Sequence, residues 1–280
     1  MRKQADLIFQ LVSLSTLVLA LAALAALVFD ILSDGAPRLS LRFLTNIASR
    51  NAENAGVYHA VMGSIWVMAL TAGLALPIGV AAAIFLEEYG SRSKMARFIE
   101  LNISNLAAVP SIIYGLLGLG LFVRLLAMGQ SVMAGASTLA LLALPVVIMS
   151  TREALRTVPN SIREGSYALG ASKWQTIWHQ VLPMALPGVL TGLILALSRA
   201  VGETAPLITI GALTYIPFAP DGIWSKFTVL PIQVFNWVSR PQPEFKANAA
   251  AGILVLMALL LSMNAIAIVV RDRQQRRGRV

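Results

Sequence analysis

Six long apolar runs limit what this 280-residue chain can fold into. Each is roughly the 20 residues that an α-helix needs to cross about 30 Å of hydrocarbon. Five are clear: Leu7–Phe29, Ala60–Leu86, Leu106–Met128, Ser131–Ser150 and Asn248–Val270. A sixth, from about Met184 to Ile216, is interrupted by Arg199 and Glu203. Since 57% of the residues are hydrophobic and only 12% are charged, we predict an all-α membrane protein with six transmembrane helices.

The basic residues of the polar segments are unevenly distributed. Segments 1–6, 87–105, 151–183 and 271–280 hold 14 Lys and Arg residues, whereas 30–59 and 217–247 hold 6. Six crossings place both termini on one side, and the positive-inside rule predicts that this side is the cytoplasm. The first run is too long for the apolar region of a signal peptide, so we expect it to be retained as a helix. The net charge of +9 mostly reflects this bias, and we do not interpret it as a nucleic-acid signal.

The polar segment 153–183 predicts two short helices on the cytoplasmic side. Ser161 with Glu164 and Ser172 with Gln175 are Ser-x-x-Glu/Gln capping boxes, which mark helix starts. Gly170 lies between them, where a left-handed backbone favours glycine. We expect the second helix to bury one apolar face and to end at Pro183. That face would comprise Trp174, Ile177, Trp178, Val181 and Leu182.

Two charged residues lie one helical turn apart inside the fifth predicted span. Arg199 is 15 residues beyond Met184, or about 22 Å along a helix axis, so it is expected to lie well inside the bilayer. Because Pro206 cannot donate to the Gly202 carbonyl, the pattern also predicts a break in the helix here. One interpretation is that Arg199 and Glu203 only neutralise each other between helices. The other is that Arg199 offers a planar fork of donors to tetrahedral oxyanions, with Glu203 holding it and Thr204 nearby as a neutral donor.

Other chemistries lack the residues they need. The chain has no cysteine, and its two histidines, His59 and His179, are far apart in sequence, so no metal or cofactor site is predicted. No Lys follows a Gly, which excludes the Gly-Lys-Ser/Thr end of a phosphate-binding P-loop. No Gly-x-Ser-x-Gly nucleophile elbow is present either. We therefore do not expect this chain to be an enzyme.

The cytoplasmic segment resembles the "EAA" loop of ABC-importer permeases. The family pattern is Glu-Ala-Ala, three residues, Gly, nine residues, then Ile-x-Leu-Pro. The matching positions here are Glu164, Gly165, Ser166, Gly170, Leu182 and Pro183, with small residues in place of the two alanines and Gln180 where the pattern has a hydrophobe. The resemblance implies that this loop, 153–183, docks into a groove of a separate ATPase subunit.

The intramembrane segment is more specific. Arg199-Ala-Val-Gly-Glu-Thr-Ala-Pro-Leu207 resembles the corresponding segment of the PstA family, one of the two permease types in phosphate ABC importers. Further stretches that resemble this family lie between Pro77 and Trp237. The resemblance implies a type I ABC-importer permease domain over 57–270, preceded by an extra helix and loop (1–56) and followed by a basic tail (271–280).

The same resemblance implies the partners. They are a PstC-like permease subunit, two copies of a PstB-like ATPase and a PstS-like phosphate-binding protein, with inorganic phosphate passing near Arg199, Glu203 and Thr204 in a bacterial inner membrane. Alternatives are a permease for sulfate, molybdate or phosphonate, and an ion-gradient-driven secondary transporter. An intramembrane enzyme with Glu203 as general base would lack any nucleophile or metal constellation.

Overall fold

A computed structural model describes residues 2–90, 93–212 and 215–277, and every regular element in these ranges is helical. The helices are α1 (Arg2–Gly35), α2 (Leu41–Thr45), α3 (Tyr58–Ile84), α4 (Lys94–Leu106), α5 (Ser111–Gly118), α6 (Val132–Arg156), α7 (Asn160–Ala168), α8 (Lys173–Thr176), α9 (Leu182–Val201), α10 (Ala205–Thr209), α11 (Leu230–Val238) and α12 (Glu244–Arg277). A 3₁₀ turn, Ala36–Arg38, follows α1, and π-helical turns follow α3 (Phe85–Tyr89), α5 (Leu119–Leu125) and α8 (Ile177–Val181).

The predicted membrane spans are largely present. Within the described residues, five helical stretches are long and apolar enough to cross a bilayer: Asp6–Arg38, Tyr58–Tyr89, Val132–Arg156, Lys173–Val201 and Glu244–Arg273. The pair Lys94–Leu106 and Ser111–Leu125 gives a sixth if it is counted as one span, but it is bent by 104°. The all-α class with up to six spans is therefore confirmed.

Two of the predicted spans have different limits. The run Leu106–Met128 is shorter than predicted: it is helical from Ser111 to Leu125, because α4 already ends at Leu106 and the Pro110 ring disfavours a helical backbone at the residue before it. In the run Met184–Ile216 the long helix ends at Val201. Residues 213 and 214 of this run lie outside the described ranges.

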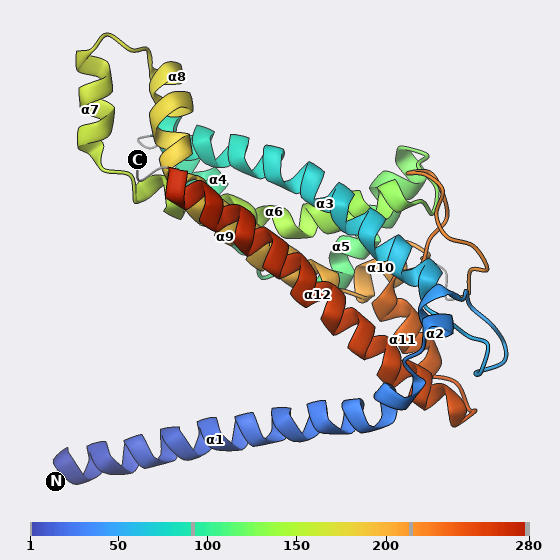
Figure 1. Ribbon diagram of the computed structural model, residues 1–280. Coiled ribbons are helices and arrows are strands. Elements are labelled where there is room, and N and C mark those ends of the chain that lie inside the picture. Colours follow the sequence, from blue (N-terminus) through green and yellow to red (C-terminus); the bar gives the residue numbers. More distant parts are fainter. Residues whose placement is uncertain (1, 91–92, 213–214, 278–280) are drawn as a thin grey trace.

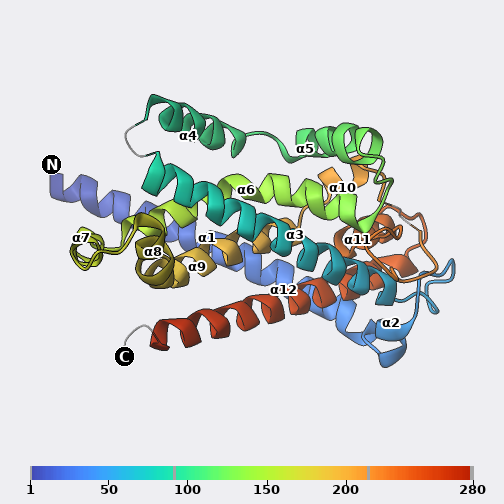
Figure 2. The same ribbon diagram turned by 90° about the horizontal axis from the view of Figure 1, so that it is seen from above.

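Helix α6 lies at the centre of the bundle, against α3, α5 and α9 (Figures 1 and 2). Small residues allow the close approach of α6 and α9. A Cβ atom on Gly188 would lie 2.6 Å from the Ala154 Cβ, and one on Gly192 would lie 1.9 Å from the Ser150 Oγ. These two glycines, spaced as Gly-x-x-x-Gly, therefore form a packing contact between the two helices.

Helix α1 leaves the bundle and extends away from it (Figure 1). None of its most apolar stretch is buried, and it meets α12 at its C-terminal end, where Gly35 packs against the backbone of Ala250. The described start of α1, the described end of α12 and the α7–α8 hairpin all lie at the same end of the molecule in both views (Figures 1 and 2). This arrangement fits an even number of crossings.

Candidate functional site

The helix break predicted beside Arg199 is present. Helix α9 ends at Val201 with Gly202 as its C-cap, and the five-residue α10 begins at Ala205 with Pro206 in its first turn. The Gly202 carbonyl, which Pro206 cannot serve, lies 3.4 Å from the Thr204 hydroxyl, which donates to it. The backbone therefore changes direction directly after Arg199, which leaves this side chain on the last turn of a helix.

Arg199 and Glu203 form an ion pair with an unequal environment. The Arg199 Nε lies 3.5 Å from the Glu203 Oε1, but the Arg199 side chain is 54% exposed, whereas that of Glu203 is 17% exposed. The carboxylate is therefore mostly covered by protein, while the guanidinium keeps donors free for another acceptor. A planar cation of this kind, anchored by one contact, can bind an oxyanion.

The neighbouring hydroxyl groups are already engaged. Thr204 donates to the Gly202 carbonyl, Thr209 lies 2.8 Å from the Pro206 carbonyl, and Ser198 lies 2.7 Å from the Asn264 side-chain oxygen of α12. These groups stabilise the break and its packing. Thr204, which we predicted as a substrate-path residue, lies next to Glu203, but its hydroxyl points back to the backbone in this structure.

Close packing against α5 supports the break. A Cβ on Gly115 would lie 2.6 Å from the Pro206 Cα and 1.7 Å from the Thr209 Oγ1, so only glycine lets α5 and α10 approach this closely. The position of α10, and with it the course of the chain after Glu203, depends on this contact.

The α7–α8 hairpin has the predicted left-handed residue and one of the two predicted caps. Gly170 has a φ of +82°, and Ser172 and Gln175 form a complete capping box. The first capping box is wrong: α7 starts at Asn160 with Pro159 as its N-cap, and Ser161 lies inside the first turn. Because the fixed φ of Pro159 suits a helix start, the N-cap lies two residues earlier than the Ser-x-x-Glu pattern suggested.

The end of the second hairpin helix is also different from our prediction. The chain stays helical from Lys173 to Val201 and passes through Pro183. The π-helical turn at Ile177–Val181 accounts for this, because it changes the hydrogen-bond register just before α9 and leaves Pro183 in the first turn of α9, where its missing N–H is tolerated.

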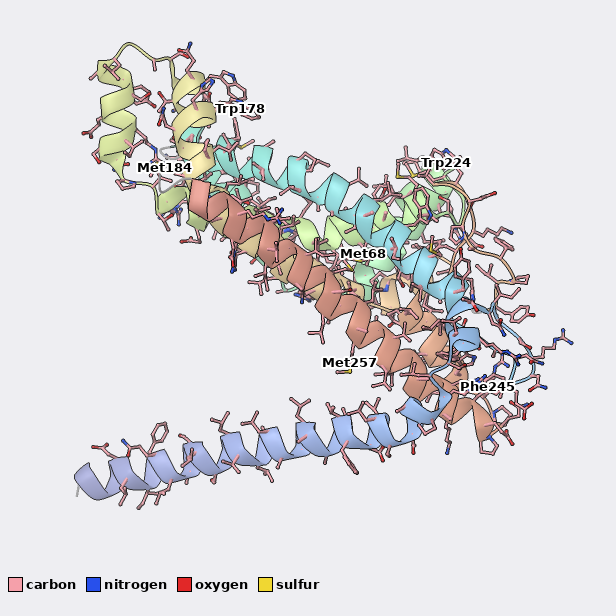
Figure 3. The ribbon with its side chains drawn as sticks, in the orientation of Figure 1. Met68, Trp178, Met184, Trp224, Phe245 and Met257 are labelled. Atoms are coloured by element: carbon pink, nitrogen blue, oxygen red, sulfur yellow. The ribbon has the colours of Figure 1, made fainter. Side chains whose placement is uncertain are left out.

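The apolar face of this helix is divided. Ile177 and Val181 are fully buried, as predicted, but Trp174 and Trp178 are 57% and 52% exposed and stack on each other with ring centroids 5.6 Å apart. Trp178, in the π-helical turn that follows α8, projects outward (Figure 3). The two indoles border an apolar groove of about 510 Å³ between the ends of α3 and α9, so the prediction that they are buried is wrong for this chain alone.

The residues of the EAA-like pattern lie along α7 and at the tip of the hairpin, except Leu182 and Pro183, which begin α9. Glu164, Gly165, Gly170 and Pro183 are exposed, and Ser166 and Leu182 are half-buried. The Ser166 hydroxyl lies 2.8 Å from the Thr176 hydroxyl, which joins the two arms. Leu169, at the tip, is 90% exposed, an unusual position for a leucine unless another surface covers it.

Sequence reasoning missed an ionic cluster at the base of the hairpin. Glu87 pairs with Arg152 at 3.2 Å and with Arg156 at 3.0 Å, and Glu88 pairs with Arg163 at 2.7 Å. Glu100 of α4 also forms an ion pair with Arg152, with 2.8 Å between the Arg152 Nη1 and the Glu100 Oε1. The sequence signal that could have revealed this cluster was the pair of adjacent acids, Glu87 and Glu88, directly after a span.

Among the described residues no group of three or more His, Cys, Asp or Glu side chains could hold a metal ion.

Comparison with known proteins gives consistent similarities. The family model "Binding-protein-dependent transport system inner membrane component" matches residues 75–279. The chain is 32% identical to a probable ABC transporter permease protein, YqgI, of Bacillus subtilis, over 87% of this chain and 88% of that one. It is 36% identical to the phosphate transport system permease protein PstA 1 of Mycobacterium tuberculosis (80% and 72%) and 32% identical to PstA of Yersinia pestis (96% and 90%).

The fold is similar to that of solved ABC transporters. A chain of the MetNI methionine ABC transporter in an inward-facing conformation matches with a TM-score of 0.61 at 20% identity, over 79% of this chain and 96% of that one. A chain of an amino acid ABC transporter matches with a TM-score of 0.52 at 17% identity, over 78% and 92%. At these identities the similarity concerns the fold alone.

Proposed function

This chain belongs to the family of binding-protein-dependent transport system inner membrane components, and we propose that it is the permease subunit through which an ATP-driven importer carries inorganic phosphate. It is a multi-span inner-membrane permease subunit of an ABC importer. The choice of phosphate is supported by its relatives, several of which are phosphate transport system permeases at 32–38% identity.

The observation that carries the proposal is the half-exposed Arg199 at the break between α9 and α10. Its charge is held on one side by the mostly covered Glu203 at 3.5 Å, while the remaining donors are open. A charge inside a bilayer is costly unless it is paired or faces a polar path; the single contact with Glu203 leaves half of the guanidinium uncovered, which supports a polar path beside it. Phosphate, a tetrahedral oxyanion, suits a planar fork of donors. Arg199, Glu203 and Thr204 are thus the proposed pathway residues.

The α7–α8 hairpin is the proposed contact with the ATPase. Its tip is built from small or exposed residues, and Leu169 offers an apolar contact that nothing in this chain covers among the described residues. Next to it, Ser161, Ile162, Gly165, Ser166, Leu169, Ala171 and Gln180 border a hollow of about 400 Å³. In this proposal Glu164, Gly165, Ser166, Gly170, Leu182 and Pro183 form or shape the docking surface.

The chain would work as half of a pore. Its proposed partners are a PstC-like second permease, a PstB-like ATPase dimer on the cytoplasmic side and a PstS-like phosphate-binding protein outside, with both termini of this chain in the cytoplasm. ATP hydrolysis would take place on the ATPase subunit. The permease domain would be 57–270, with 1–56 as an additional helix and loop and 271–280 as a basic tail, of which 278–280 lie outside the described residues.

A reconstituted complex tests this function. The chain is purified with its second permease and ATPase, placed in lipid vesicles and supplied with the binding protein. We expect phosphate-loaded binding protein to stimulate ATP hydrolysis and uptake of labelled phosphate, and sulfate, molybdate or phosphonate to have little effect. Stimulation by one of these other oxyanions would correct the substrate. Uptake driven by an ion gradient without any ATPase would refute the proposal.

A further inference from the structure

Two consecutive glutamates at the end of α3 reach different parts of the molecule. They lie in the π-helical turn Phe85–Tyr89, and such turns re-aim side chains relative to a regular α-helix. Glu87 contacts Arg152 and Arg156 at the end of α6, whereas Glu88 contacts Arg163 of α7. The π-helical turn that continues α3 is therefore joined to α6 by Glu87 and to the hairpin by Glu88.

Arg163 makes the connection between Glu88 and the hairpin. Its Nη2 lies 2.7 Å from the Glu88 Oε1, and the same guanidinium donates to the backbone carbonyls of Val158, at 2.7 Å, and Leu155, at 3.1 Å. Leu155 is in the last turn of α6, so one side chain of α7 binds the C-terminal end of α6 and the end of α3 together. Only the planar, five-donor guanidinium can serve these three acceptors at once.

The other arm of the hairpin contacts the same turn of α3. The Lys173 ammonium donates to the Glu88 backbone carbonyl and lies 4.7 Å from the centre of the Tyr89 ring. Ser166 and Thr176 join the two arms to each other. The chain itself joins the hairpin to α6 and α9, which precede and follow it in sequence. The contacts of Arg163 and Lys173 with Glu88 add a connection to α3, which is not adjacent to the hairpin in sequence.

Burial makes the Glu88–Arg163 pair different from a surface ion pair. The two side chains are 7% and 15% exposed, whereas the Arg271–Asp272 pair on α12 is 29% and 51% exposed. An exposed pair contributes little and breaks easily, but removing one partner of a covered pair leaves an uncompensated charge away from water. The covered pair therefore holds the hairpin and α3 in a fixed relation.

We propose that Glu88 and Arg163 are positioning residues that transmit movement of the α7–α8 hairpin to α3. This inference rests on the proposed function, in which the hairpin moves with the ATPase. Helix α3 packs along α6 and also contacts α9, the helix that carries Arg199. A displacement of the hairpin thus moves three spans together, through the chain for α6 and α9 and through Glu88 for α3.

The test separates ATP hydrolysis from transport in the reconstituted complex. Glu88→Gln removes the charge but keeps the size of the side chain, and Arg163→Lys keeps the charge but not the fork. For each variant we expect the assembled complex to hydrolyse ATP in response to loaded binding protein at close to the wild-type rate. Phosphate uptake falls about tenfold. The double variant Glu88→Gln with Arg163→Lys should take up phosphate no more slowly than the more impaired single variant, because both substitutions break the same contact.

Asp272→Asn is the matched control, since it removes an acid from an exposed pair, and it should leave both rates unchanged. Normal uptake by both single variants would overturn the inference. So would a parallel loss of uptake, hydrolysis and assembled complex, because that pattern describes a pair needed only for folding. Additive losses in the double variant would show that the residues act separately and also overturn it. A wild-type complex without phosphate-stimulated hydrolysis would overturn the proposed function, and this inference with it.

Discussion

The contact between α6 and α9 depends on the missing side chain of Gly192, and this allows a quantitative prediction. A Cβ at this position would lie 1.9 Å from the Ser150 Oγ and 2.3 Å from the Ser150 Cβ, far inside normal contact distance. The Ser150 hydroxyl is also bonded to the Val146 carbonyl at 2.8 Å, which limits its movement. Gly192→Ala therefore forces the two helices apart or Ser150 out of place.

The expected magnitude combines two opposing effects. Overpacking of a close contact typically costs about 1–3 kcal/mol, and the short distances here favour the upper end. Alanine in a helix interior recovers about 1 kcal/mol relative to glycine. We expect Gly192→Ala to lower the free energy of unfolding by about 2 kcal/mol, which lowers Tm by about 4–8 °C for a protein of this size.

A compensating change follows from the same distances. Ser150→Gly removes both offending atoms, after which the nearest atom to the new methyl group is the Cα of residue 150 at 3.6 Å, an ordinary contact. The double variant Gly192→Ala with Ser150→Gly should therefore lie within about 1 kcal/mol of the wild type, because the two propensity changes nearly cancel. The small residue has simply moved from α9 to α6.

Thermal unfolding of the purified chain in detergent, followed by tryptophan fluorescence, measures these differences. Gly73→Ala in α3 is the matched control: no atom lies within 4 Å of its new methyl group, so it should be neutral or slightly stabilising. An unchanged Tm for Gly192→Ala, or a double variant as unstable as the single one, would refute the packing described for these helices.

Three further predictions concern function and topology. Arg199→Lys should strongly reduce phosphate uptake while the complex still assembles, because a point charge replaces a planar fork; near-normal uptake by the double variant Arg199→Leu with Glu203→Leu would instead make the pair structural. Gly170→Val places a β-branched residue at a φ of +82°, which costs about 1–2 kcal/mol or more locally, so coupled transport should fall while insertion continues; normal transport would exclude the hairpin as the coupling element. In this cysteine-free chain, Asp221→Cys, at an exposed position, should react with a membrane-impermeant thiol reagent from outside the cell and Ser166→Cys should not; the reverse pattern would invert the topology.

Local sequence patterns were sufficient where the cause lies within one or two helical turns. The apolar runs predicted the spans, because length and hydropathy decide whether a helix can cross a bilayer. Gly202 and Pro206 marked the break after Arg199, and Gly170 marked the left-handed residue of the hairpin. Each of these features follows from backbone sterics or hydrogen bonding near the residue itself.

Local patterns failed where neighbouring turns compete. Pro183 was expected to end a helix, but the π-helical turn before it places Pro183 in the first turn of α9, where its missing N–H is tolerated. The two tryptophans fit an amphipathic stripe, yet they border an open groove, because periodicity shows which residues share a face and not what covers that face. The run Leu106–Met128 likewise begins in the bend of 104° between α4 and α5, so its helix starts only at Ser111.

The sequence by itself therefore determined that this protein is a helical membrane protein, that Arg199 and Glu203 lie beside a helix break, and which segment forms the hairpin. Only the tertiary structure decided that Glu203 is covered while Arg199 remains half-exposed, and that Glu87 and Glu88 meet arginines 65 to 75 residues away. The reason is physical. Helix propensity and span length depend on adjacent residues, whereas the exposure of a charge and the partner of an acid depend on which helices pack beside it, and that is set by the close contacts of the whole bundle.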